Sequence, residues 1–115
     1  VFLTGDLHSG QVNKIEHVWK SISSTLYEVI SSPLTAGADT ELKNPARLDI
    51  FAGDEESITA QNFVTLDFQG PLNDRKMLIR YWDSDGKLLN QKRGADPGTP
   101  TDLSVIHAND LIPRN

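Results

Sequence analysis

The chain of 115 residues contains no cysteine, which excludes a disulfide framework and a thiolate site within it. It is also poor in basic residues. It has 11 Lys and Arg against 16 Asp and Glu, which gives a formal net charge of −5. The basic residues form no basic stripe of the kind that binds a phosphate backbone. We therefore expect no nucleic-acid partner. No apolar run approaches the length of a bilayer, so we also expect no membrane span.

The N-terminus has no initiator methionine and no charged region followed by an apolar one. It begins directly on the apolar residues Val1-Phe2-Leu3, which are typical of a strand. We expect that a preceding stretch of polypeptide has been removed and that the chain is a fragment. An exported enzyme trimmed by a signal peptidase would begin in the same way, so both explanations stay open.

An aspartate and a histidine follow this apolar run, in the sequence Thr4-Gly5-Asp6-Leu7-His8. In an extended chain, residues two apart project from the same side, so Asp6 and His8 can reach one metal centre or two adjacent ones. Metal-dependent phosphoester hydrolases present ligands at the end of a strand in this manner. The alternative is a surface aspartate and histidine that follow a core strand, because Asp-x-His is a common tripeptide.

Strand patterns dominate the rest of the chain, most clearly in residues 24–31, 62–68 and 76–82, which are rich in β-branched and aromatic residues. The sequence Asp83-Ser84-Asp85-Gly86 has the composition of a hairpin turn, after which residues 87–92 are expected to return as a partner strand. It lacks the glycine and glutamate positions of an EF-hand calcium loop. The sequence therefore predicts a mostly β meander of one domain.

Three segments are less regular. Residues 11–22 fit an amphipathic helix and an imperfect strand about equally well, so the choice stays open. Residues 33–47 are expected to form a long loop, and loops of that length are usually functional or mobile. Residues 93–115 contain several prolines and glycines and few apolar residues, and are expected to form a surface tail or extension.

Other candidate sites are weaker. No Gly-x-Ser-x-Gly elbow accompanies Ser31 and Ser32, so Ser-His-Asp hydrolysis is not expected. We expect His17 to lie at a surface or sheet edge, and His107 has no set of neighbouring ligands. The pair Glu55-Glu56 is acidic enough to attract a cation, and a solvated loop explains it equally well.

Taken together, four segments in order resemble the C-terminal part of the PhoD-like metallophosphoesterases, the alkaline phosphatase D family of the calcineurin-like superfamily. These segments are Leu-Thr-Gly-Asp-x-His-Ser-Gly at 3–10, Leu-Tyr-Glu-Val-Ile-Ser-Ser-Pro-Leu-Thr at 26–35, Gln-Asn-Phe-x-Thr-Leu-x-Phe at 61–68, and Asp-x-Asp-Gly at 83–86. The resemblance covers residues 1–92.

The resemblance implies an α+β, mostly β fold, with antiparallel and mixed strands that form part of a calcineurin-like sandwich of two sheets between helices. It also implies a metal-dependent hydrolase of phosphomonoesters and phosphodiesters with a pair of metal ions, iron and calcium in the best-known members. Members are commonly exported, which implies an extracytoplasmic location. The family's metal ligands carry over to Asp6 and His8 and to no other residue of this chain.

The remaining ligands of the family, a cysteine among them, precede this motif and are absent here. Two ligands cannot hold a catalytic pair of metals, so we expect the isolated chain to be inactive and its partner to be the missing N-terminal portion of the same polypeptide. A rival interpretation takes Gly5-Asp6-Leu7-His8 as the first motif of a protein Ser/Thr phosphatase and Gly53-Asp54 as the second, but no Asp-Arg-Gly or Gly-Asn-His-Glu follows. The alternative from another class is a non-catalytic β-rich packing or binding domain.

Overall fold

The computed structural model describes residues 1–5, 9–32, 48, 50 and 60–114 of the chain. The described residues are mostly β, as the sequence predicts. They form the strands β1 (Phe2–Thr4), β2 (Gln11–Trp19), β3 (Ile22–Ile30), β4 (Asn62–Gln69), β5 (Lys76–Asp83) and β6 (Val105–His107). Three short 3₁₀ turns join them: η1 (Leu72–Asp74), η2 (Asp102–Ser104) and η3 (Ala108–Leu111).

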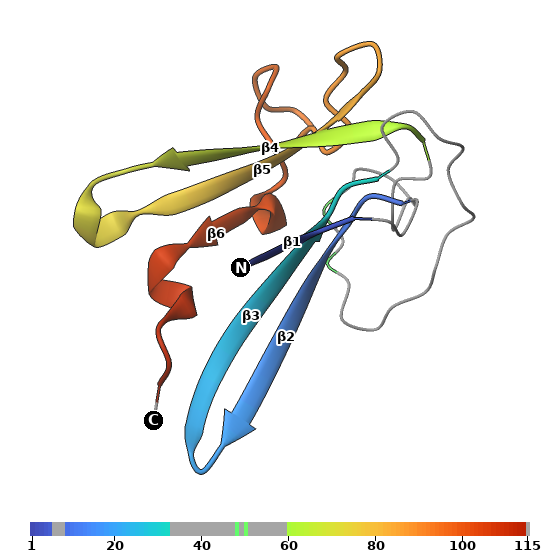
Figure 1. The fold of residues 1–115 in the computed structure, drawn as a ribbon. Coiled ribbons are helices and arrows are strands. Elements are labelled where there is room, and N and C mark those ends of the chain that lie inside the picture. The colour runs from blue at the N-terminus through green and yellow to red at the C-terminus, as the bar shows by residue number, and fades with distance from the viewer. Residues whose placement is uncertain (6–8, 33–47, 49, 51–59, 115) are drawn as a thin grey trace.

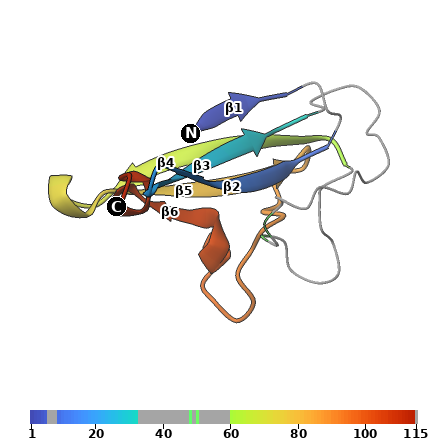
Figure 2. The same ribbon diagram turned by 90° about the horizontal axis from the view of Figure 1, so that it is seen from below.

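The first sheet has the strand order β1-β3-β2, in which β1 pairs with β3 in parallel and β2 pairs with β3 as a hairpin (Figure 2). The ambiguous segment 11–22 is therefore a strand followed by a turn. Lys20 and Ser21 form this turn with φ values of 46° and 68°. Positive φ at both central residues is the geometry of a two-residue hairpin turn, because its twist matches that of the flanking strands.

The second sheet has the order β4-β5-β6 and is antiparallel throughout. Along β5 the side chains alternate between the two faces of the sheet. Met77, Ile79 and Tyr81 are buried, whereas the residues between them are half-buried. The predicted strands at 24–31, 62–68 and 76–82 are thus confirmed to within two residues at their ends.

The two sheets face each other across one apolar core. The β2–β3 and β4–β5 hairpins converge at one end and splay apart at the other, and β6 and the C-terminal residues lie between the splayed ends (Figure 1). A single cluster of buried residues fills the space between the sheets: Val12, Tyr27, Val29, Ile50, Met77, Ile79, Tyr81 and Ile106. Burial of apolar surface against both sheets is what holds the layers together.

The buried hydroxyl of Tyr81 connects the layers where the hairpins converge. It lies 2.9 Å from the carbonyl oxygen of Gln11 and 2.6 Å from that of Ile30, at the start of β2 and the end of β3. Burial raises the pKa of this hydroxyl, so it stays a protonated donor. A second buried residue, Asn90, accepts a hydrogen bond from the backbone N–H of Tyr81 and donates to the carbonyl of Ile79.

The predicted turn at 83–86 forms, but the predicted return strand at 87–92 does not. The carboxylate of Asp83 accepts hydrogen bonds from the N–H groups of Asp85 and Lys87, and Gly86 has a φ of 81°. Beyond the turn, Leu88 makes a single bridge to Trp82. The side chain of Asn90, instead of a partner strand's backbone, then bonds to the backbone of Tyr81 and Ile79 in β5, and the chain leaves the sheet.

The segment 93–115, which the sequence predicts as a surface tail, contributes β6 to the second sheet. Ile106 in this strand pairs with Met77 and is buried in the shared core. A strand of three residues is too short to show periodicity, and prolines and glycines surround it, so the sequence gives no clear signal for it. No helix among the described residues is long and apolar enough to cross a membrane.

Candidate functional site

Parallel pairing of β1 and β3 brings the segments that follow them to the same edge of the first sheet. The backbone N–H of Ser31 donates to the carbonyl of Thr4 at 3.2 Å, so the two chains leave the sheet side by side. Ligand sites in sheets with parallel strands lie at the carboxyl ends of those strands. Asp6 and His8 follow β1 in sequence and lie outside the described residues. Their neighbours Gly5 and Ser9 are described and mark this edge as the candidate site.

Buried polar side chains gather at this edge. Four of them, with exposed fractions of 2% or less, are Ser9, Gln11, Asn13 and Asn62. Within the described part of the chain, Ser9 Oγ and Gln11 Oε1 are buried without a hydrogen-bond partner. Buried polar atoms normally bind another polar group, water or an ion, because leaving them unpaired costs about 1–3 kcal/mol each. The candidate site is therefore polar and has unsatisfied oxygen atoms.

Asn62 fixes the end of β3 relative to β4. Its side-chain oxygen accepts a hydrogen bond from Ser31 Oγ at 3.0 Å, and its amide donates to the carbonyls of Ser32 and Ala60, both at 2.9 Å. Gly10 packs against the same residue. A Cβ atom at Gly10 would lie 3.1 Å from the Asn62 oxygen and 3.0 Å from the ring of Tyr81, so a larger residue would push the segment after residue 8 away from the core.

A row of hydrogen bonds extends from Gln11 across the first sheet. Gln11 donates to Asn13 at 3.3 Å, and Asn13 donates to the carboxylate of Glu28 at 3.0 Å. Thr4 donates to the other carboxylate oxygen of Glu28, also at 3.0 Å. These bonds join β2, β3 and β1 just behind the edge. They give the strands that flank residues 6–8 a fixed register and leave Glu28 engaged on both oxygens.

The described residues do not provide a metal centre by themselves. No group of three His, Cys, Asp or Glu side chains able to hold a metal ion occurs among them. The unpaired oxygens of Ser9 and Gln11 fit a polar, ion-bearing edge, and Asp6 and His8 have suitable donor chemistry, since carboxylate oxygen suits calcium or iron and imidazole suits iron. Two ligands remain too few for two metal ions, so further ligands would have to be supplied from elsewhere.

The structure also places the weaker candidates from the sequence. His17 is exposed on β2 opposite Ser24, and His107 is exposed at the end of β6. Ser31 bonds to Asn62, and none of the hydrogen bonds of the described residues joins it to a histidine. The predicted loop at 33–47 and the residues Asp54, Glu55 and Glu56 lie outside the described residues.

Gln11 and Asn13 were not identified from the sequence, and Asn62 was included only within the 61–68 segment of the resemblance, without a role. One signal was present, because Gln11 and Asn13 alternate with Val12 at the start of β2 and so occupy one face next to the Gly-Asp-x-His motif. That signal requires residues 11–19 to be a strand, which periodicity alone left undecided. Searches against protein-family models, curated proteins and solved structures found no match to this chain.

Proposed function

We propose that this chain is the C-terminal part of a PhoD-like, metal-dependent hydrolase of phosphomonoesters and phosphodiesters, to which it contributes Asp6 and His8 as metal ligands. The observation that supports the proposal most is the setting of the strand that precedes the motif in sequence. β1 pairs in parallel with β3, and buried polar side chains lie among the described residues next to the ends of these strands. A site of this kind suits ligands that must be held on a rigid frame.

The metals expected from the resemblance are iron and calcium, and Asp6 and His8 would hold part of that pair. When bound, such a pair activates a water molecule and neutralises the charge of the phosphoryl oxygens. The described residues would act as the frame. Asn62 holds the end of β3 in place, and close packing of Gly10 against Tyr81 fixes the start of β2 against the core.

We further propose that the two sheets belong to a calcineurin-like sandwich completed by the N-terminal portion of the same polypeptide. β1 supports this proposal. Phe2 and Leu3 point to opposite faces of the sheet and have exposed fractions of 59% and 63%, although parallel strands are normally covered on both faces. The extracytoplasmic location implied by the resemblance stays a prediction.

The test compares the complete protein with its Asp6→Asn variant in the hydrolysis of a chromogenic phosphodiester at alkaline pH, with calcium and iron supplied. We expect the substitution to abolish most turnover while circular dichroism still reports a β-rich fold. Asp85→Asn is the matched control, because Asp85 is exposed in the 83–86 turn. Asp6→Asn activity equal to that of Asp85→Asn would overturn the proposal.

A second candidate is a non-catalytic packing or binding domain. The exposed apolar residues on the first sheet favour it, since a surface of this kind suits attachment to another body. This candidate predicts a stable fold without metal and no phosphodiesterase activity in the complete protein. Metal-dependent hydrolysis that Asp6→Asn removes would exclude it.

A further inference from the structure

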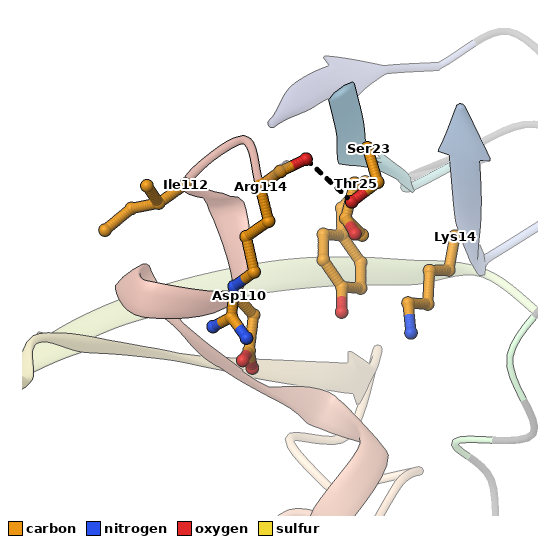
Figure 3. Close-up of a pocket in the computed structure, with 7 residues that line it drawn as sticks. Lys14, Ser23, Thr25, Asp110, Ile112 and Arg114 are labelled. Carbon is orange, nitrogen blue, oxygen red and sulfur yellow. Dashed lines mark hydrogen bonds between the residues drawn. The ribbon is translucent and has the colours of Figure 1, made fainter. Parts of the chain in front are cut away.

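A polar cavity of about 290 Å³ lies between the β2–β3 hairpin and the C-terminal segment (Figure 3). Its volume is near the lower end of small-molecule pockets, which are about 300–1,000 Å³. The residues that line it are Lys14, Ser23, Thr25, Tyr27, Asp110, Ile112 and Arg114. They come from positions up to 100 residues apart in the sequence, and none of them belongs to the candidate site.

Backbone pairing holds the two walls of the cavity together. The N–H of Ser23 donates to the carbonyl of Arg114 at 2.6 Å, and the N–H of Arg114 donates to the carbonyl of Ser23 at 2.8 Å. The Ser23 hydroxyl also donates to the carbonyl of Arg114 at 3.3 Å, as the dashed line in Figure 3 shows. The cavity is thus bounded by a short two-stranded bridge.

Tyr27 forms the inner wall of the cavity. Its exposed fraction is 7%, and among the hydrogen bonds of the described residues none involves its hydroxyl. Burial raises the pKa of this hydroxyl, so it stays protonated and able to donate. This hydroxyl lines the cavity and is not among the fully buried polar atoms without a partner, so it can donate to a polar ligand there.

Charged groups face the cavity from both walls. Figure 3 shows Lys14 on one side and Asp110 and Arg114 on the other. Lys14 contacts Glu16 at 2.9 Å, which engages one of the three donors of its ammonium group, and Arg114 donates one bond to the carbonyl of Asn109 at 3.3 Å. Both cations therefore keep further donors for a ligand.

The lining has more donors than acceptors. Two cations and the hydroxyls of Thr25 and Tyr27 can donate, whereas Asp110 supplies the carboxylate. The three charged groups that line the cavity sum to one positive charge in a chain whose net charge is −5. This balance suits a ligand with an oxyanion at one end and a donor at the other.

We propose that this cavity binds a small zwitterionic metabolite, whose phosphate or carboxylate group contacts Lys14, Arg114 and Tyr27 and whose ammonium group contacts Asp110. A phosphate and a carboxylate share this chemistry, and both are deprotonated acceptors near neutral pH. The site does not depend on the proposed phosphoesterase activity.

Binding is measured by calorimetry and by NMR shifts of the Thr25 and Tyr27 amides, on the full protein with a chelator present. The probes are O-phosphoethanolamine, β-alanine and inorganic phosphate. O-phosphoethanolamine carries an ammonium group and a phosphate, and β-alanine carries an ammonium group and a carboxylate. Inorganic phosphate has no ammonium group. We expect saturable binding of at least one zwitterion, with inorganic phosphate weaker than O-phosphoethanolamine.

Lys14→Met should weaken the affinity for the bound zwitterion by about tenfold, since it removes a charged hydrogen bond and keeps the aliphatic stem. Lys92→Met is the matched control, because Lys92 pairs with Asp102 outside the cavity. Asp110→Asn should lower the affinity for the zwitterion and leave the affinity for inorganic phosphate unchanged or higher. Far-UV circular dichroism confirms that each variant is folded.

The proposal is overturned if none of the zwitterions saturates, or if Lys14→Met and Lys92→Met bind equally well. It is also overturned if Asp6→Asn alone abolishes binding, because the ligand would then occupy the candidate metal site. Loss of phosphodiesterase activity in Asp6→Asn with unchanged zwitterion binding would support both proposals separately.

Discussion

The outer faces of the two sheets of this protein differ in how their side chains are paired and exposed. On the second sheet the outward side chains of β4 and β5 pair with one another. Arg80 forms an ion pair with Asp67 and donates to the carbonyl of Gly98 at 2.7 Å, and Trp82 donates to Thr65 at 2.9 Å and stacks on Phe63. The outer face of the first sheet instead carries apolar residues with exposed fractions of 41–63%: Phe2, Ile15, Trp19, Ile22 and Leu26.

The two outer faces therefore differ in how far their apolar side chains are covered. On the second sheet, polar and aromatic pairs across the strands cover much of the outer face, although Phe63 keeps an exposed fraction of 40%. The first sheet has one face in the shared core, and its other face is apolar and exposed toward the β2–β3 turn, whereas Gln11 and Asn13 on that face are buried. A cluster of exposed apolar side chains usually marks a contact with another protein surface. Gly5 and Ser9, the described residues that flank Asp6 to His8 in the sequence, belong to this less covered half of the molecule.

The largest contrast should come from the same truncation on the two sheets. Ile79→Ala removes a fully buried side chain and is expected to destabilise the fold by about 2–5 kcal/mol. Ile15→Ala removes a side chain with an exposed fraction of 46% and should cost less than about 1 kcal/mol. Urea denaturation measures both. Equal losses would mean that the outer face of the first sheet is covered in solution.

Tyr81→Phe tests the link between the sheets. It removes the hydroxyl that bonds to Gln11 and Ile30, and should cost about 1–3 kcal/mol because buried acceptors lose their donor. Urea denaturation at neutral pH measures this loss. A variant as stable as the parent would show that apolar packing alone joins the layers.

Tyr81→Phe should also change the pH dependence of stability. Burial raises the folded-state pKa of Tyr81, so above the unfolded-state value of about 10 the unfolded chain releases a proton that the folded chain keeps. The contribution is thus fully present below about pH 10 and is lost as the pH rises further. The parent should lose stability more steeply than Tyr81→Phe between about pH 9 and 11. Parallel losses would contradict this expectation.

The β2–β3 turn offers a stabilising change confined to the first sheet. Ser21 has a φ of 68°, a conformation that costs an L-residue about 1 kcal/mol and costs glycine little. Ser21→Gly should therefore raise the free energy of unfolding by up to about 1 kcal/mol. The second-sheet turn already has Gly86 at a φ of 81°, so Gly86→Ala should have the opposite sign. Thermal denaturation of the pair gives both signs, and a destabilised Ser21→Gly would contradict the turn geometry.

The smallest effects should come from the ion pairs on the two sheets. Asp67→Asn removes the partner of the largely buried Arg80 and is expected to cost about 0.5–1 kcal/mol. Glu16→Gln breaks a pair with the more exposed Lys14 and should cost at most about 0.5 kcal/mol. Denaturation at low and high salt separates the two. A larger loss for Glu16→Gln than for Asp67→Asn would contradict this expectation.

Much of the strand content could be predicted because its signals are local. Enrichment in β-branched and aromatic residues at 76–82 identifies β5, and Gly86 identifies the turn after it. Residues 11–19 were undecided because Val12, Ile15 and Trp19 also fit a helical stripe. Pairing with β3 makes residues 11–19 a strand, and such pairing depends on a second segment as well as on residues 11–19 themselves.

What the sequence could not predict depends on contacts between distant residues. The return strand after Gly86 fails because the Asn90 side chain bonds to Tyr81 and Ile79, which no local pattern reveals. The same holds for the cavity, whose walls meet through Ser23 and Arg114, 91 residues apart. At the candidate site, Asp6 and His8 were identified from the motif, and the polar surroundings emerge only from burial.

The Tyr81 hydroxyl also bears on the order in which the molecule folds. Each hairpin closes a short stretch of chain, whereas Tyr81 joins residues 51 and 70 positions away. Local contacts form quickly, and distant ones wait for the entropy of closing a long loop to be overcome. We expect the two hairpins to form early and to dock late. Removing this hydroxyl should then accelerate unfolding far more than it slows folding.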